Sequence, residues 1–201
     1  MYVPVSLTGT VDNILTVYHA APQPTLAAGH CWYELAHRSV VSLSHRYSVS
    51  VDVAAAVVAT LSPAVRWAMN IAYADKLLAA IAQDQPVAAV PMSAYGINRQ
   101  RAELIARTGN LTLLRGPKVM AFFCNLRNPH QPGPVTIDRH ALRIWLYGLA
   151  DPPASDLSCR TTTYNLAAEA YRSAAAELNG PLVRVMPHHV QATTWLHIRH
   201  S

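Results

Sequence analysis

A lysine and an aspartate have residue types and positions that could do chemistry. Lys118 follows Gly116 in the turn "LLRGPKVMA", and Asp138 lies twenty residues later, where "VTIDRHALRI" starts a helix. Lys118 and Lys76 are the only lysines of the chain, and the other Lys and Arg positions are arginines. Unlike an arginine guanidinium, a lysine amine can lose its proton and attack carbon. A nearby carboxylate can stabilise positive charge at that carbon or orient the nucleophile. The alternatives are a surface cation for Lys118 and a helix N-cap for Asp138, and capping is compatible with a catalytic role.

The composition predicts a compact globular protein. The chain has 201 residues, of which 51% are hydrophobic and 13% charged, so it is too apolar for a disordered tail. Its length is sufficient for one domain over residues 1–201 or for two interleaved lobes. The formal charge of +5 leaves room for a polyanionic partner.

The cysteines and the apolar segments indicate a cytoplasmic protein. Cys31, Cys124 and Cys159 are scattered and have no C-x-x-C spacing, so we expect neither a disulfide framework nor a cysteine-only metal site. The start, "MYVPVSLTGTVDN", lacks the pattern of a signal peptide, and the longest apolar stretch, "VDVAAAVVATL", is too short to span a bilayer.

Helical periodicity dominates the sequence, and no sustained strand alternation interrupts it, so we predict an all-α fold. In the first helix we expect Trp32, Leu35, Ala36, Val40 and Leu43 to form the apolar face. Pro63 is expected in the first turn of a helix, where its missing N–H would be unpaired anyway. The predicted helices cover 28–48, 51–62, 63–82, 97–106, 117–126, 136–148, 161–180 and 186–201.

The order of these motifs resembles the helix-hairpin-helix DNA glycosylase superfamily, which includes endonuclease III. The family's hairpin reads roughly L-P-G-V-G-x-K-x-A and its later motif V-D-x-H-x-x-R, and "LLRGPKVMA" and "IDRHALRI" are the counterparts here. The resemblance extends from about Asp52 to the C-terminus and looks closest to small phage-encoded relatives. It implies a two-lobed helical fold, with the hairpin at about 100–126 and the catalytic loop and helix at about 134–148.

The resemblance also implies roles for individual residues. Asp138 matches the catalytic aspartate, and Lys118 matches the lysine that attacks the sugar C1′ in bifunctional members. The partner would be double-stranded DNA with one nucleotide flipped out, since a base inside the duplex is unreachable. We expect DNA contacts from the hairpin, the arginines and the catalytic helix, and pocket or DNA-inserting roles around 62–70. The DNA-binding candidates are Arg99, Arg101, Arg115, Gly116, Arg127, His140 and Arg143, and the pocket candidates are Ser62, Pro63, Trp67 and Asn70.

The chain departs from the family pattern in its hairpin and at its end. Leu114 replaces the first hairpin glycine, and Pro117 removes an N–H from a turn whose amides normally face a phosphate. We therefore expect phosphate binding by this turn to be weaker, or to depend on Arg115. The four clustered cysteines of the iron–sulfur members are missing, and we expect no cofactor. The histidines of the last helix, His188, His189, His197 and His200, have no carboxylate or cysteine beside them, so we expect surface or packing roles and no metal.

Three functions are compatible with these residues. The first is a DNA glycosylase that excises a damaged or modified base, with or without lyase activity through Lys118. The second is an enzyme that transfers groups onto modified phage bases on the same fold. The third is a non-catalytic DNA-binding module, which would tolerate the loss of Asp138 and would bind DNA in a strongly salt-dependent way. No residue identifies the base or an obligate protein partner.

Overall fold

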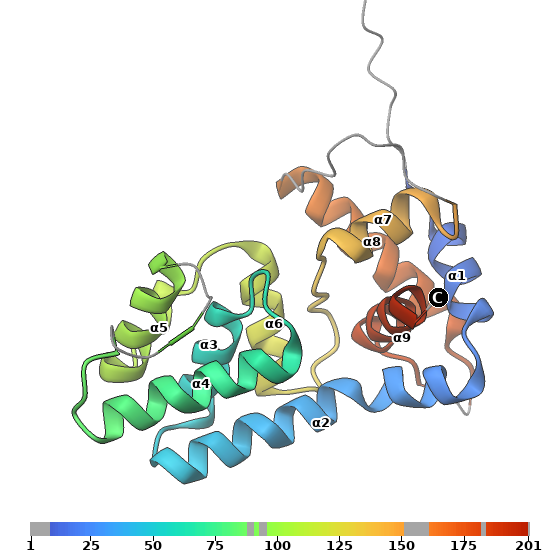
Figure 1. Cartoon of the computed structure of the whole chain (residues 1–201). Helices are drawn as coiled ribbons and strands as arrows, with labels where there is room; N and C mark the ends of the chain where they lie inside the picture. Colours follow the sequence, from blue (N-terminus) through green and yellow to red (C-terminus); the bar gives the residue numbers. More distant parts are fainter. Residues whose placement is uncertain (1–8, 88–90, 93–95, 151–160, 182–183, 201) are drawn as a thin grey trace, which may run out of the picture. The chain divides into compact units, whose positions relative to one another are not determined.

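The computed structural model describes residues 9–87, 91–92, 96–150, 161–181 and 184–200. The regular elements of these residues are all helices, so the all-α prediction is confirmed (Figure 1). They are α1 Val11–Ala20, α2 Gln23–Tyr47, α3 Val51–Leu61, α4 Trp67–Ala82, α5 Gly96–Thr108, the short 3-10 helix η2 Leu111–Leu113, α6 Pro117–Arg127, α7 Arg139–Tyr147, α8 Thr161–Leu178 and α9 Pro187–His200.

The chain divides into two compact units. Unit 1 contains both ends of the chain, Met1–Tyr33 and Pro132–Ser201, and unit 2 contains Glu34–Gln131. The division falls inside α2, so this helix begins in unit 1 and ends in unit 2. No helix in the described ranges is long and apolar enough to cross a membrane.

Unit 1 is built from α1, α7, α8 and α9 around one apolar cluster. Helix α1 was not predicted from the sequence. Its signal was nevertheless present, because Ile14, Val17 and Tyr18 recur at helical spacing and are buried in the cluster. The Thr10 side chain caps the helix by accepting a hydrogen bond from the Asn13 N–H at 3.1 Å.

A glycine lets α2 and α9 approach closely within unit 1. A Cβ atom at Gly29 would lie 2.5 Å from Thr193 Cα and 2.7 Å from Thr193 N, which are distances that a real side chain does not reach. The backbones can therefore cross here only because position 29 has no side chain.

Unit 2 is organised around α3, against which α4, α5 and α6 pack. Ser50 caps this helix at its N-terminus, and all residues from Val53 to Leu61 are buried. The prediction of an apolar, buried helix ending at Ser62 is confirmed, since Ser62 is the C-cap. The helices expected on either side of the Gly116 turn are also present, as α5 and α6.

Two local predictions in unit 2 are wrong. Pro63 does not begin a helix, because Ala64 adopts a left-handed conformation (φ 61°) and the Val65 N–H closes a turn onto the Ser62 carbonyl at 3.2 Å. Helix α4 begins four residues later, at Trp67. Leu35 is 56% exposed, because the buried face of α2 follows Ala36, Val40 and Leu43.

Candidate active site

Asp138 is the N-cap of α7. Its Oδ1 accepts hydrogen bonds from the backbone N–H groups of His140 at 3.0 Å and Ala141 at 2.8 Å. Two helix-terminal amides are thus satisfied by one carboxylate oxygen, and Oδ2 takes part in neither bond. The side chain is half-buried, so its carboxylate is held in a defined orientation and retains contact with the surface.

Side chains from α8 hold the backbone that leads to Asp138. The Arg172 Nε–H donates to the Gly133 carbonyl at 2.9 Å, and the buried Tyr164 hydroxyl donates to the Val135 carbonyl at 2.6 Å. Each bond satisfies a carbonyl in a segment that has no helix of its own. The position of Asp138 therefore depends on α8 as well as on α7.

A buried hydrogen-bonded cluster fixes Thr136, two residues before Asp138. The Tyr33 hydroxyl oxygen lies 2.9 Å from Thr136 Oγ1 and 3.0 Å from Gln191 Oε1. A hydroxyl has one proton and an amide oxygen only accepts, so Tyr33 donates to Gln191 and accepts from Thr136 when both bonds are made. Since all three side chains are at most 6% exposed, the cluster excludes water and ties the segment before Asp138 to α2 and α9.

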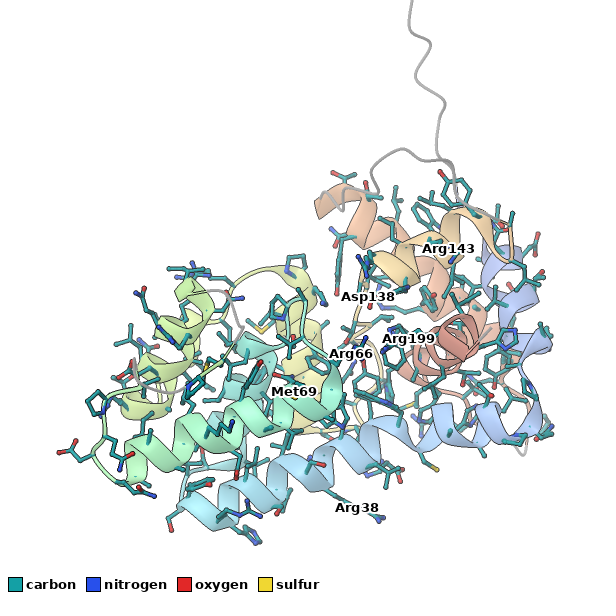
Figure 2. The ribbon with its side chains drawn as sticks, viewed as in Figure 1. Arg38, Arg66, Met69, Asp138, Arg143 and Arg199 are labelled. Atoms are coloured by element: carbon teal, nitrogen blue, oxygen red, sulfur yellow. The ribbon has the colours of Figure 1, made fainter. Side chains whose placement is uncertain are left out.

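Positive charge gathers near the start of α7. Burial lowers the pKa of the half-buried His140; the Asp138 carboxylate opposes this shift, and the guanidinium groups of Arg139, Arg199 and Arg143 add to it. Figure 2 labels Asp138 at the start of α7, Arg143 further along this helix and Arg199 near the end of α9. Unit 1 thus places one carboxylate among several guanidinium groups, a setting suited to an anionic ligand.

In unit 2, Lys118 lies in the first turn of α6, directly after a glycine turn. Gly116 is the N-cap with φ 81°, a conformation that side chains rarely adopt, and Pro117 occupies the first helical position. Leu114, the residue two positions before Gly116, is buried in unit 2. The Arg115 guanidinium turns back onto η2, where Nη1 donates to the Leu114 carbonyl at 3.0 Å and to the Thr112 carbonyl.

The other candidates of unit 2 differ in their surroundings. Asn70 is 1% exposed, and its Nδ2 donates to the Val58 carbonyl at 3.1 Å, which ties α4 to α3. Ser62 donates to the Ala59 carbonyl at 2.8 Å, and Pro63 lies half-buried in the following turn. Trp67 is half-buried and meets Phe122 edge to face, with ring centroids 6.4 Å apart.

The whole net charge of the chain belongs to unit 2. This unit has ten of the 16 Lys and Arg residues and five of the 11 Asp and Glu residues, whereas the six basic and six acidic residues of unit 1 balance. Three acidic residues of unit 2 are neutralised in ion pairs, namely Asp52 with Arg127 at 2.8 Å, Asp75 with Arg46 at 2.7 Å and Glu103 with Arg107 at 3.0 Å. Within the described ranges, Arg99, Arg101, Arg115 and Lys118 form no ion pair.

Histidines pack inside unit 1. His188 is fully buried and meets the rings of Tyr33 and His189 edge to face, at centroid distances of 5.3 Å and 4.6 Å. His189 also stacks on His30 at 4.9 Å, and His30 Nε2 lies 2.7 Å from the Tyr18 hydroxyl. In the part of the chain that the structure describes, no three His, Cys, Asp or Glu side chains are grouped so that they could hold a metal ion.

Of the predicted pair, Lys118 belongs to unit 2 and Asp138 to unit 1. The structure does bring Asp138, His140 and Arg143 together on α7. The structure also associates Tyr33, Gln191 and Arg199 with this group, and none of these three was predicted from the sequence. The spacing of Gln191, Trp195 and Arg199 at i and i+4 was the one available signal, because it places them on one face of α9.

The described residues define an all-helical protein in which one unit carries a capped aspartate and the other a lysine after a glycine turn between two helices. The chain belongs to a family of unknown function, DUF7178, whose model matches residues 2–201. No curated protein and no solved structure matches it.

Proposed function

We propose that this chain is a DNA glycosylase that excises a damaged or modified base from double-stranded DNA. In this proposal the fold is a divergent, two-lobed relative of the helix-hairpin-helix glycosylases. Asp138 supplies the carboxylate for cleavage of the glycosidic bond, and Lys118 is the candidate nucleophile of a bifunctional enzyme.

The capped Asp138 carries the proposal. Its Oδ1 is engaged by two amides of α7, while Oδ2 is not used by the cap. The hydrogen bonds at Gly133, Val135 and Thr136 restrict the preceding segment. A carboxylate held in place before the substrate arrives stabilises developing positive charge without having to reorganise, which is the usual source of electrostatic catalysis.

The charge and hairpin of unit 2 support DNA as the partner. All of the +5 net charge lies in this unit, and Arg99, Arg101, Arg115 and Lys118 form no ion pair within the described ranges. Unpaired cations can replace the counterions of a phosphate backbone. The turn at Gly116 between α5 and α6 also agrees with the helix-hairpin-helix resemblance.

The reaction needs few groups. The C1′–N bond breaks, the base leaves with the bonding electrons and takes up a proton, and water or the Lys118 amine forms the new bond to C1′. The carboxylate of Asp138 would stabilise the positive charge that builds at C1′, or take the proton from an attacking water. Attack by Lys118 would give a Schiff base with the opened sugar.

The first test is mass spectrometry of free bases released from a panel of damaged and phage-modified duplexes. We expect the native protein to release a base and the Asp138→Asn variant to release none. Asp12→Asn, which changes an exposed aspartate of α1, is the control and should release the base as the native protein does. If the native protein binds these DNAs but releases no base, excision is refuted for the panel. Added mass on intact nucleosides would then support group transfer. Intact nucleosides without added mass would support a non-catalytic DNA-binding module.

Lyase activity is tested by borohydride trapping, which reduces a Schiff base to a stable protein–DNA adduct. The chain provides its own control, because Lys76 is the only other lysine and is exposed on α4. Lys76→Gln should still be trapped and Lys118→Gln should not. Base release without trapping by the native protein would make it monofunctional and remove the nucleophilic role of Lys118.

A further inference from the structure

One face of α9 leads from the core of unit 1 toward the start of α7. Gln191, Trp195 and Arg199 follow one another at four-residue spacing, so their side chains lie in one row along the helix. Gln191 is buried and bonded to the Tyr33 hydroxyl, which also contacts Thr136. The row therefore begins beside the segment that precedes Asp138.

The other end of the row acts electrostatically on α7. Arg199 is exposed, and its guanidinium lowers the pKa of His140, on which the Asp138 carboxylate also acts. The buried Tyr171 hydroxyl lies 3.4 Å from both the Ala141 carbonyl of α7 and Thr194 Oγ1 of α9, which keeps the two helices together. Trp195 follows Thr194 directly.

Trp195 belongs to an aromatic corner that is only half-buried. Its ring lies 6.1 Å from that of Trp32 in an edge-to-face arrangement, and the Arg199 Cζ atom lies 4.5 Å from its centroid. Both tryptophans retain contact with the surface, whereas the neighbouring Tyr33 is enclosed. A tryptophan with a guanidinium over its face offers a flat, polarisable and positively charged surface.

We propose that Trp32, Trp195 and Arg199, here called the Trp195 face, bind the unpaired base of a nucleotide presented to Asp138. This inference rests on the proposed function and assigns residues for holding the base. Nucleobases stack on aromatic rings and on arginine planes, and the arginine can also attract the adjoining phosphate. The face would select an unpaired base over a stacked one, because a base inside the duplex has no accessible ring surface.

The test compares the binding of two labelled duplexes that differ by one unpaired nucleotide, using fluorescence anisotropy. The native protein should bind the duplex with the unpaired nucleotide about tenfold more tightly, in line with the strength of a base–aromatic contact. Trp195→Leu and Arg199→Gln should remove most of this preference, while Trp195→Phe, which keeps a ring, should retain much of it. Arg184→Gln changes an exposed arginine elsewhere in unit 1 and should leave the preference unchanged.

A preference that survives both Trp195→Leu and Arg199→Gln would overturn the proposal, and so would equal binding of the two duplexes by the native protein. If Trp195→Leu fails to fold, Arg199→Gln decides the result, since Arg199 is exposed. Failure here is distinguishable from failure of the proposed function. If base release depends on Asp138 but not on the Trp195 face, the proposed glycosylase is retained and the proposed base-binding face is refuted. If the native protein releases no base, but its preference for the unpaired nucleotide is lost in the Trp195→Leu and Arg199→Gln variants, the base-binding face is retained and the proposed enzyme is refuted.

Discussion

The cluster of Tyr33, Thr136 and Gln191 makes a prediction about how Asp138 is positioned. Tyr33→Phe removes one oxygen atom and keeps the ring that packs in unit 1. Gln191 Oε1 then loses its donor, and the Thr136 hydroxyl loses a partner 2.9 Å away. A buried polar group left without its partner costs about 1–3 kcal/mol, so we expect a loss of about 2 kcal/mol in the free energy of unfolding. For a chain of this length that is a fall of about 4–8 °C in melting temperature.

Thermal unfolding followed by circular dichroism measures this loss, and Tyr47→Phe is the matched control. Tyr47 donates to Asp75 at 2.8 Å in unit 2, but both residues are only half-buried, so water can replace the lost bond. The control should change the melting temperature by less than about 2 °C, as surface substitutions usually do.

A positioning role requires more than a loss of stability. In the proposed glycosylase, Tyr33→Phe should lower kcat for base release well below the melting temperature and leave the affinity for DNA near the native value. Tyr33→Phe and Thr136→Val should also be less damaging together than the sum of their separate effects, by about 1 kcal/mol, because they remove the same bond. Additive effects, or a native kcat in a destabilised Tyr33→Phe protein, would refute the reasoning.

Three further predictions concern unit 1. Asp138→Ala should lower the melting temperature by about 2–4 °C, because loss of an N-cap costs about 1 kcal/mol. Asp138→Asn should melt like the native protein, because asparagine caps about as well as aspartate, and equal melting temperatures of the two variants would contradict the capping role. Gly29→Ala should lower the free energy of unfolding by about 1–3 kcal/mol, because its Cβ would lie 2.5 Å from Thr193 Cα. Gly96→Ala should be tolerated, because its Cβ would meet no atom within 4 Å, and unfolding in urea measures both variants. Burial lowers the pKa of His30 below its ordinary value of about 6.5. The unfolded chain therefore binds more protons than the folded chain, and stability should fall as the pH decreases below about 6.5. Melting temperatures measured across this range should depend less on pH in His30→Gln than in the native protein, and an unchanged dependence would contradict the assignment.

The fold was predictable wherever one helix contained its own signals. Helix α3 is apolar on every side and has Ser50 as its cap, and α7 begins after Asp138 and ends at Gly148, so the start and end of each could be predicted from a few adjacent residues. The start of α4 was not predictable in this way. Pro63 is compatible with a helical first turn, but the left-handed conformation of Ala64 has no signature in its residue type.

The close approach of α2 and α9 was also hidden in the sequence. A glycine inside a helical pattern usually weakens the helix, and nothing near Gly29 shows that Thr193 will lie against it. Such a contact depends on where two helices cross, which is a property of the folded unit. The exposure of Leu35 has a similar origin, because the periodicity of α2 allowed a wider apolar face than the structure buries.

The candidate site shows the same division between local and distant information. The N-cap role of Asp138 could be predicted because the aspartate and the helix that it caps lie within ten residues of each other. The groups that position it could not, since Tyr33 is 103 residues from Thr136 and 158 residues from Gln191 along the chain. Any buried tyrosine, threonine or glutamine needs a hydrogen-bond partner, but residue types do not specify which one. If the proposed chemistry is correct, substitutions at these three positions should impair it as specifically as changes near the motif, because they move the carboxylate without touching the substrate.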